Sequence, residues 1–175
     1  MKKLRVLYTV LVASMCVVQS CKKDDPEVFQ MGNQEFITYA SSSNNLEIEA
    51  GELSKTRGQS DTIKSFGVQT VADHTAAETR LANLAARKGF GVPQNFLSHH
   101  AGNLNILSQV TLSSFDRRFA ELMVLTDQEL VNLFRLASQP DGVPDAEIRS
   151  WAASELPALE EDLSESQAMY VLTSQ

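Results

Sequence analysis

The sequence predicts an all-α domain, built as a four-helix bundle with one long crossover. Four segments carry apolar residues at spacings of three and four, the period of an amphipathic helix. No segment of the sequence shows the alternating pattern of a half-buried strand. The second and third segments are separated by residues 89–113, a stretch long enough to run the length of a bundle.

The first two helices are expected at residues 33–57 and 61–88. Within the first, residues 41–45 (SSSNN) have low helix propensity and mark a weak point. The second should begin after Ser60, a suitable N-cap, and end at Gly89, a suitable C-cap. Its inward face comprises Ile63, Phe66, Thr70, His74, Ala77, Leu81 and Leu84.

The last two helices are expected at residues 114–138 and 145–172. Ser113 should cap the first of them, with Asp116 three residues on in an imperfect capping box. This segment is so widely apolar that we expect it to be well buried. The other segment contains Pro157, which costs ~3 kcal/mol inside a helix and predicts a kink just before it.

The long link after the second helix decides the topology. Two antiparallel hairpins joined by one long central crossover make the ferritin-like arrangement, whereas a simple up-and-down bundle has short loops throughout. Residues 97–110 (LSHHAGNLNILSQV) should form a short helix within the crossover. Adjacent side chains diverge, so we expect His99 and His100 to face solvent rather than to form a joint site.

The N-terminus predicts export and a lipid anchor. Residues 1–20 combine three basic residues with a short apolar run, as in a signal peptide. The sequence VVQSC resembles a lipoprotein cleavage site, which would leave Cys21 lipidated and residues 21–33 as a flexible tether. The folded domain would then span residues 34–172. The expected location is the cell envelope, on the periplasmic or the surface face of the outer membrane, with the membrane bound through the anchor.

Composition excludes several functions. The net charge of -7 and the lack of a basic patch argue against nucleic-acid binding. GFGVP at residues 89–93 lacks the spacing of a phosphate-binding loop. No Ser, His and Asp set or activated cysteine suggests a hydrolase, so we do not expect an enzyme. With Cys16 removed in the signal peptide and Cys21 acylated, no disulfide can form.

Three stretches carry a resemblance to a known family. They are LEIEAGELSKTRGQSDTIKSFGVQTVADHTAAETRLANLAARKGFGVP, FDRRFAELMVLTDQELVNLF and WAASELPALEEDL. With them the chain resembles the exported bacterial ferritin-like family named domain of unknown function 4142. That family shows an acidic pair in the first helix, Asp-His in the second and third, and Leu-Pro-x-Leu-x-x-His-Leu in the fourth. The matching positions here are Glu47, Glu49, Asp73, His74, Asp127 and Asp162, so two of three family histidines are carboxylates.

Helical projection selects the polar side chains that point inward. His74 falls near the centre of its apolar stripe, with Glu78 one turn later. Glu47 is a better inward candidate than Glu49. Counted from the hairpin turn, Glu47 and His74 differ in height along the bundle axis by roughly 4.5 Å. On the last two helices, Asp127 and Glu155 lie at nearly the same height along the bundle axis, counted from their hairpin turn. Asp162 lies farther from the turn and at the edge of the apolar stripe of its helix. It is kept as the alternative partner of Asp127.

These residues support two functional interpretations. In the first, His74 hydrogen-bonds a carboxylate such as Glu47, and the protein is a non-catalytic envelope lipoprotein with a structural or binding role. In the second, a divalent metal is bound, because buried carboxylates need a proton, a cation or a metal. The candidate ligands are Glu47, His74, Glu78, Asp127, Glu155 and Asp162. One imidazole among oxygens suits Mn, Fe or Zn, with possible oxidoreductase-like activity, although the Glu-x-x-His signature of ferritin-like metal sites is absent.

The broad apolar face of the third long helix suggests a protein partner or self-association. Val124 and Val131 widen that face. A third interpretation is a partner-binding module, in which this face could dock an envelope protein or a second copy of the chain.

Overall fold

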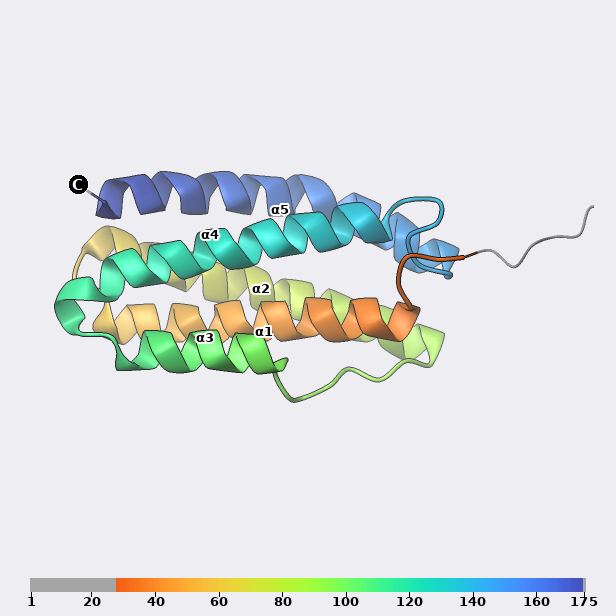
Figure 1. The fold of residues 1–175 in the computed structure, drawn as a ribbon, viewed down its shortest axis with the longest axis horizontal. Helices are drawn as coiled ribbons and strands as arrows, with labels where there is room; N and C mark the ends of the chain where they lie inside the picture. The colour runs from red at the N-terminus through yellow and green to blue at the C-terminus, as the bar shows by residue number, and fades with distance from the viewer. Residues whose placement is uncertain (1–27, 175) are drawn as a thin grey trace, which may run out of the picture.

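The computed structural model describes residues 28–174, so the expected signal peptide, Cys21 and most of the tether lie outside the described residues. Within that range the chain forms five helices and no strand, which confirms the all-α prediction. Figure 1 shows them as α1 Asn33–Arg57, α2 Asp61–Lys88, α3 Ser98–Gln109, α4 Leu112–Ala137 and α5 Ala146–Thr173. None of these helices is both long and apolar enough to span a bilayer.

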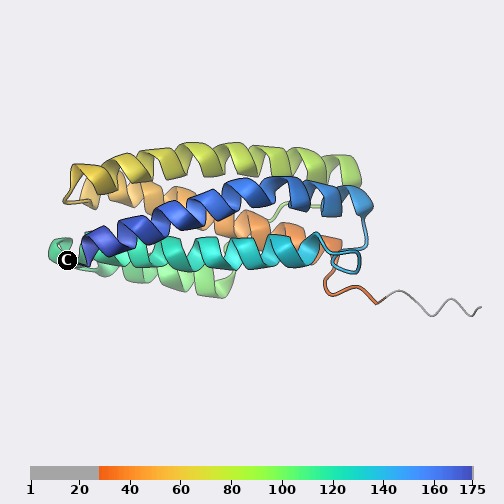
Figure 2. The ribbon, with the colours of Figure 1, turned by 90° about the horizontal axis from the view of Figure 1, so that it is seen from above.

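The four long helices lie side by side as a helical bundle (Figure 1, Figure 2). α1 packs against α2, and α4 packs against α5, as two hairpins that meet where α1 contacts α4. The short helix α3 belongs to the crossover and lies along α1 and α4. Both the crossover and its short helix were predicted from the sequence.

A polar layer divides the interior into two apolar clusters. One cluster includes Phe36, Leu81 and Phe134, and the other includes Leu46, Ile63 and Phe119. The residues between them on each long helix are polar and buried, and they comprise Ser41, Ser43, Asn44, Glu47, Thr70, His74, Thr126, Asp127 and Ser166. The segment 41–45, expected to be a weak point, is continuous helix because its side chains are enclosed in this layer. All four long helices therefore contribute to one cross-section of polar side chains.

Val131 does not lie on a free surface. It is 1 % exposed and belongs to the first apolar cluster, so the interpretation in which it docks a partner is wrong. Val124 is half-buried. The width of the apolar face on α4 is explained by packing against α1, α3 and α5 at once.

The helix ends follow local capping chemistry. The Ser60 hydroxyl accepts a hydrogen bond from the Ile63 amide at 3.1 Å, and Gly89 ends α2 with a φ of 74°. The predicted cap at Ser113 is wrong, because α4 begins after Thr111. Asp116 instead accepts hydrogen bonds from the backbone of residues 59 and 60, at 2.7 and 2.9 Å. It therefore holds the start of α2 against the start of α4.

Two glycines allow α1 and α2 to approach closely. A Cβ atom at Gly67 would lie 1.6 Å from Ser54 Oγ and 2.9 Å from the carbonyl oxygen of Gly51. A Cβ atom at Gly51 would lie 2.8 Å from the carbonyl oxygen of Gly67. Gly51 follows Glu47 by one turn and Gly67 precedes His74 by two. The close approach therefore sets the separation of the helices that carry these two side chains.

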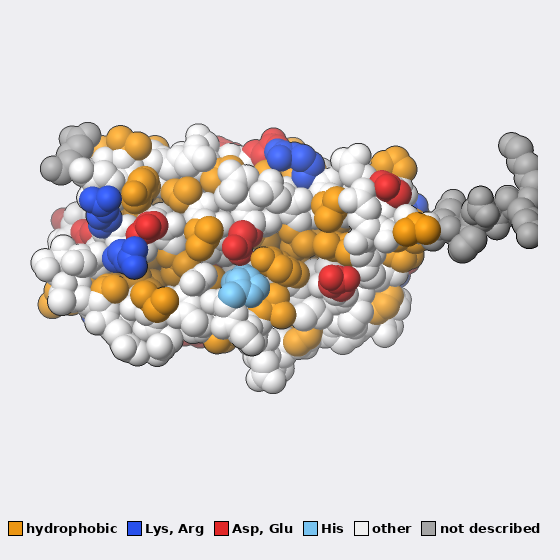
Figure 3. All heavy atoms as spheres, viewed as in Figure 1, with side chains coloured by type: hydrophobic (Ala, Val, Ile, Leu, Met, Phe, Trp, Pro, Cys, Tyr) orange, Lys and Arg blue, Asp and Glu red, His pale blue; other side chains and the backbone are white. Residues whose placement is uncertain are grey.

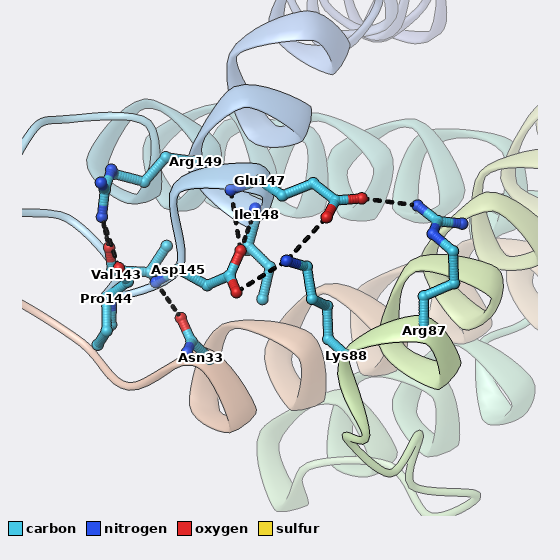
Figure 4. A network of polar contacts seen from close by, with 9 residues as sticks. All are labelled: Asn33, Arg87, Lys88, Val143, Pro144, Asp145, Glu147, Ile148 and Arg149. Atoms are coloured by element: carbon cyan, nitrogen blue, oxygen red, sulfur yellow. Dashed lines mark hydrogen bonds and ion pairs between the residues drawn. The ribbon is translucent and has the colours of Figure 1, made fainter.

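The other end of the bundle is held by an ion network (Figure 4). Lys88 Nζ lies 3.0 Å from Asp145 Oδ2 and 2.7 Å from Glu147 Oε2, and Arg87 pairs with Glu147 at 3.1 Å. Asp145 also caps α5, and its amide donates to Asn33 Oδ1 at 3.0 Å. The network joins the end of α2 to the starts of α1 and α5.

Helix α5 is continuous through Pro157. Figure 1 shows a change of direction in the N-terminal half of this helix, the half that contains the proline. Proline removes one backbone donor and crowds the preceding turn, which is the usual cause of such a bend.

Candidate functional site

The polar layer is centred on a hydrogen-bonded pair. His74 Nε2 lies 2.8 Å from Glu47 Oε2, and the two side chains are only 5 % and 2 % exposed. The pair joins α2 to α1 across the close contact made by the two glycines. Our interpretation that His74 contacts Glu47 is confirmed.

A second set of contacts fixes the tautomer of His74. Asn44 Nδ2 donates to Glu78 Oε2 at 3.1 Å, and Glu78 Oε1 also accepts from Ser41 Oγ at 2.7 Å. Because the amide NH₂ group of Asn44 faces Glu78, the amide oxygen of Asn44 faces His74 Nδ1, at a distance of 3.1 Å. Nδ1 must therefore carry the proton that is donated to Asn44. In the neutral ring, the lone pair of Nε2 then points toward Glu47.

Asp127 brings a second carboxyl group to the same point. One ligand atom from each of Glu47, His74 and Asp127 lies within 4.8 Å of the other two. Asp127 is 2 % exposed, and neither its Oδ1 atom nor Glu47 Oε1 has a hydrogen-bond partner. Among the described residues, no Lys or Arg forms an ion pair with either carboxyl. Two buried acids thus face each other beside one imidazole.

Burial governs the protonation of this cluster. It raises the pKa of Glu47 to about 8, and it raises the pKa of Asp127 well above its usual value, with the neighbouring Glu47 charge adding to the effect. Burial also lowers the pKa of His74, although Asp127 and Asp162 oppose that shift. Without a bound cation the cluster therefore favours a neutral imidazole and at least one shared proton between the acids.

A small cavity and an acidic groove connect the cluster to solvent. The cavity, ≈ 10 Å³, has room for about one water molecule or ion, and Glu47, His74, Asp127 and Asp162 are among the residues that line it. A groove of ≈ 320 Å³ between α2 and α5 shares His74 and Asp162 with the cavity. The acidic residues that line this groove are Asp73, Glu155, Glu161, Asp162 and Glu165. Their charge favours the entry of cations over anions.

The structure separates the predicted ligands into three groups. Glu47, His74 and Asp127 converge at one point. Asp162 is half-buried at the edge of the same cavity, where burial raises its pKa to about 6. Glu78 lies behind Asn44 and orients it.

Glu155 is placed elsewhere. Its carboxylate pairs with Arg80 at 2.6 Å, on the groove between α2 and α5. Glu155 was predicted as the partner of Asp127 because the two lie at similar heights along the bundle axis. Height alone does not fix the rotation of a helix about its own axis, and the rotation decides which side chains point inward. The position suggested by the family resemblance, Asp162, is the one that reaches the cavity.

Sequence reasoning missed two residues that shape the site. Asn44 and Ser41 belong to the segment judged only as a poor helix former, yet both contact Glu78 and are buried. A signal was present in the sequence. The polar run Ser41–Asn44 lies between the inward apolar residues Ala40 and Leu46, a pattern that a polar interior explains as well as a break does, and all four residues are buried.

The comparisons with known proteins identify the family. The sequence profile described as domain of unknown function (DUF4142) matches residues 20–169. The chain belongs to this family. The DUF4142 match covers α1, α2, α4 and the part of α5 up to residue 169, and so includes every residue of the polar layer. No curated protein and no solved structure is significantly similar to the chain.

Proposed function

We propose that this DUF4142 protein is a lipid-anchored protein of the bacterial cell envelope that binds one divalent metal ion through Glu47, His74 and Asp127. One observation carries the metal assignment. An imidazole nitrogen and two carboxylates converge within 4.8 Å in the interior, and two carboxylate oxygens there have no partner. A bound cation would satisfy both oxygens and remove the cost of adjacent buried acids.

The donor set narrows the choice of metal. One imidazole with two carboxylates suits Mn²⁺, Fe²⁺ or Zn²⁺ better than a soft ion such as Cu⁺. Asp162, at the rim of the cavity, is the nearest further carboxylate. The hydrogen bond from His74 Nδ1 to Asn44 is the kind of outer contact that orients a metal-binding histidine.

We further assign the bundle to the ferritin-like class. Two helical hairpins connected by a long crossover support this, as do acidic side chains and a histidine that face the interior. The absence of Glu-x-x-His from the sequence sets the site apart from the di-iron arrangement of that class. We therefore propose a single metal ion in a binding role without catalysis.

The envelope location rests on the N-terminus alone. Basic residues, a short apolar run and VVQSC precede a charged tether, which supports lipidation of Cys21 and attachment to the outer membrane. Expression with a radiolabelled fatty acid tests this. We expect label in the wild-type chain and none in Cys21→Ser, whereas equal labelling of both would contradict the anchor.

Metal binding is tested on the full-length protein purified in detergent. After removal of metals by chelation, Mn²⁺, Fe²⁺ or Zn²⁺ is added in turn, and bound metal is counted by native mass spectrometry. We expect wild type to bind one more ion of the preferred metal than His74→Ala. Glu49→Gln is the control, because Glu49 is exposed on α1, the helix that carries the proposed ligand Glu47. Equal metal content in wild type and His74→Ala would contradict the proposal.

One observation favours a second candidate function. The 2.8 Å contact of His74 with Glu47 is complete as a hydrogen bond without any metal. In that case the polar layer fixes how the helices align, and the protein has a structural role. His74→Ala would then lower the unfolding temperature equally with and without added metal.

A further inference from the structure

A second group of metal-ligating side chains lies outside the polar layer, where α3 crosses α1 and α4. His99 and His100 come from the first turn of α3, and Glu129 comes from α4. One ligand atom from each lies within 4.8 Å of the other two. The expectation that both histidines face solvent is wrong. His100 is completely buried, and the two rings lie 4.0 Å apart between centroids.

The His100 ring is oriented by a contact of its Nδ1 atom. Its Nδ1 atom lies 2.7 Å from Ser42 Oγ, which also accepts a hydrogen bond from the Leu97 amide at 2.8 Å. A hydroxyl oxygen has two lone pairs, so it can accept from Nδ1–H as well as from the amide. The Nε2 atom of this buried ring has no hydrogen-bond partner. It lies 3.5 Å from Glu129 Oε2.

The surroundings of the Glu129 carboxyl group favour a neutral ring at His100. Burial lowers the pKa of His100, and the neighbouring His99 lowers it further, against the opposing effect of Glu129. Tyr39 places its hydroxyl 3.3 Å from both His99 Nε2 and Glu129 Oε2. Burial and the Glu129 charge raise the pKa of this tyrosine, which keeps it a neutral hydrogen-bond donor. Among the described residues, no Lys or Arg pairs with Glu129.

The spacing and type of the donors are compatible with a zinc ion. Nε2 of His99 and of His100 lie 3.9 and 3.5 Å from Glu129 Oε2. In a tetrahedral zinc site, bonds of about 2.0–2.2 Å put neighbouring donors about 3.3–3.5 Å apart. Both distances to Glu129 exceed that spacing by about 0.6 Å or less, and one ligand atom from each of the three side chains lies within 4.8 Å of the other two. The geometry points to a Zn²⁺ site formed by His99, His100 and Glu129, separate from the interior cluster.

The site is open to solvent on one side. A groove of ≈ 400 Å³ is lined by Gln34, Glu35, Thr38, Tyr39, Leu97 and His99. Of the three proposed ligands only His99 lines this groove, so water in the groove can approach the site from the side of His99. Figure 3 shows a histidine and an acidic side chain next to each other on this face of the molecule.

Zinc at this position would tie the crossover to the bundle. Only His100 and Leu107 of α3 are buried, so this helix has little apolar contact of its own. A metal bound by two residues of α3 and one of α4 would join these helices directly, and binding only to the folded state stabilises it.

The test is a zinc titration of the full-length protein in detergent after removal of metals. It compares wild type with His99→Ala, Glu129→Gln, His74→Ala and the control Glu121→Gln. Glu121 is an exposed acid on α4, eight residues before Glu129. We expect His99→Ala and Glu129→Gln each to bind one zinc ion fewer than wild type. Loss of a residue that only hydrogen-bonds a metal ligand lowers metal affinity by about 10–100-fold, so loss of a ligand itself should lower the affinity of this site by more than about 100-fold. Glu121→Gln should bind as wild type does.

The variants also separate this site from the interior one. If only the site at α3 exists, His74→Ala keeps all the zinc of wild type and His99→Ala binds none. If both exist, each of these variants loses one ion. Retention of wild-type stoichiometry and affinity by His99→Ala and Glu129→Gln would overturn the inference. Circular dichroism of each metal-free variant confirms that it is folded, and His99, at the surface, is the substitution least damaging to the fold.

Discussion

Asn44 Oδ1 accepts a hydrogen bond from His74 Nδ1 at 3.1 Å, and this contact determines what the other ring nitrogen can do. With the proton on Nδ1, the Nε2 lone pair points to the space shared with Glu47 and Asp127. Glu78 and Ser41 hold the Asn44 amide in the required orientation. The interior cluster is therefore a prearranged set of acceptors, suited to a proton or a metal ion.

Asn44→Ala should weaken metal binding without touching a ligand. Removal of the acceptor for Nδ1–H frees the ring to change tautomer and orientation. We expect about 10–100-fold lower affinity for Mn²⁺ or Zn²⁺ at the interior site. Isothermal titration calorimetry measures this, with the exposed Glu49→Gln as the control on the same helix. Unchanged affinity in Asn44→Ala would show that the hydrogen bond does not position His74.

Asp127→Asn should have opposite effects on stability and on binding. The amide can donate to Glu47 and removes one of two facing acids, so the metal-free protein should become more stable at pH 8 by about 1 kcal/mol or more. Metal affinity at the interior site should fall, because a carboxylate ligand is lost. Urea unfolding in EDTA and metal titration provide the two readouts. A variant that is less stable and still binds metal as wild type would contradict this.

The metal-free protein should lose stability as the pH rises from about 6.5 to about 8. Burial raises the pKa of Glu47 to about 8. In that range the folded protein holds a proton that the unfolded chain has released, so ionisation favours unfolding. The lowered pKa of His74 acts in the opposite direction, but only below its ordinary value of 6.5. Urea unfolding in EDTA at several pH values measures the trend.

Excess Mn²⁺ should remove that loss of stability, because the metal binds the ionised acids. Glu47→Gln provides the control, since it cannot ionise and should show a flatter dependence on pH. A metal-free wild type whose stability increases over this range would contradict the assignment of a buried, protonated Glu47.

Gly67→Ala should destabilise the bundle by about 1–3 kcal/mol. The new methyl group would meet Ser54 Oγ and the Gly51 carbonyl, so α1 and α2 would have to separate. Gly102→Ala is the matched control, because nothing lies within 4 Å of a Cβ atom there. It should be neutral or stabilise α3 by up to about 1 kcal/mol. Equal unfolding free energies for the two variants would show that the close approach is not required.

The sequence predicted the helices well because their signals are local. Ser60 and Gly89 fix the ends of α2 through their own side chain and backbone, whatever the rest of the molecule does. The inward positions of Glu47 and His74 followed from a period that a single helix determines. Their mutual contact followed from depth in a hairpin whose short turn leaves little freedom.

The relations between distant segments could not be predicted in the same way. Glu155 matched Asp127 in depth, but the rotation of α5 turns it toward Arg80. His99 and His100 diverge on an isolated helix, yet docking of α3 buries the His100 ring and brings both rings beside Glu129. Helical period alone contains no information about either arrangement.

Anomalous X-ray diffraction from crystals grown with Mn²⁺ tests metal binding in the interior most directly. We expect an anomalous peak within bonding distance of His74 Nε2 and of one oxygen each from Glu47 and Asp127, with His74 Nδ1 still donating to Asn44. A map with no peak at this position, and with His74 Nε2 still hydrogen-bonded to Glu47, would contradict the interior metal site.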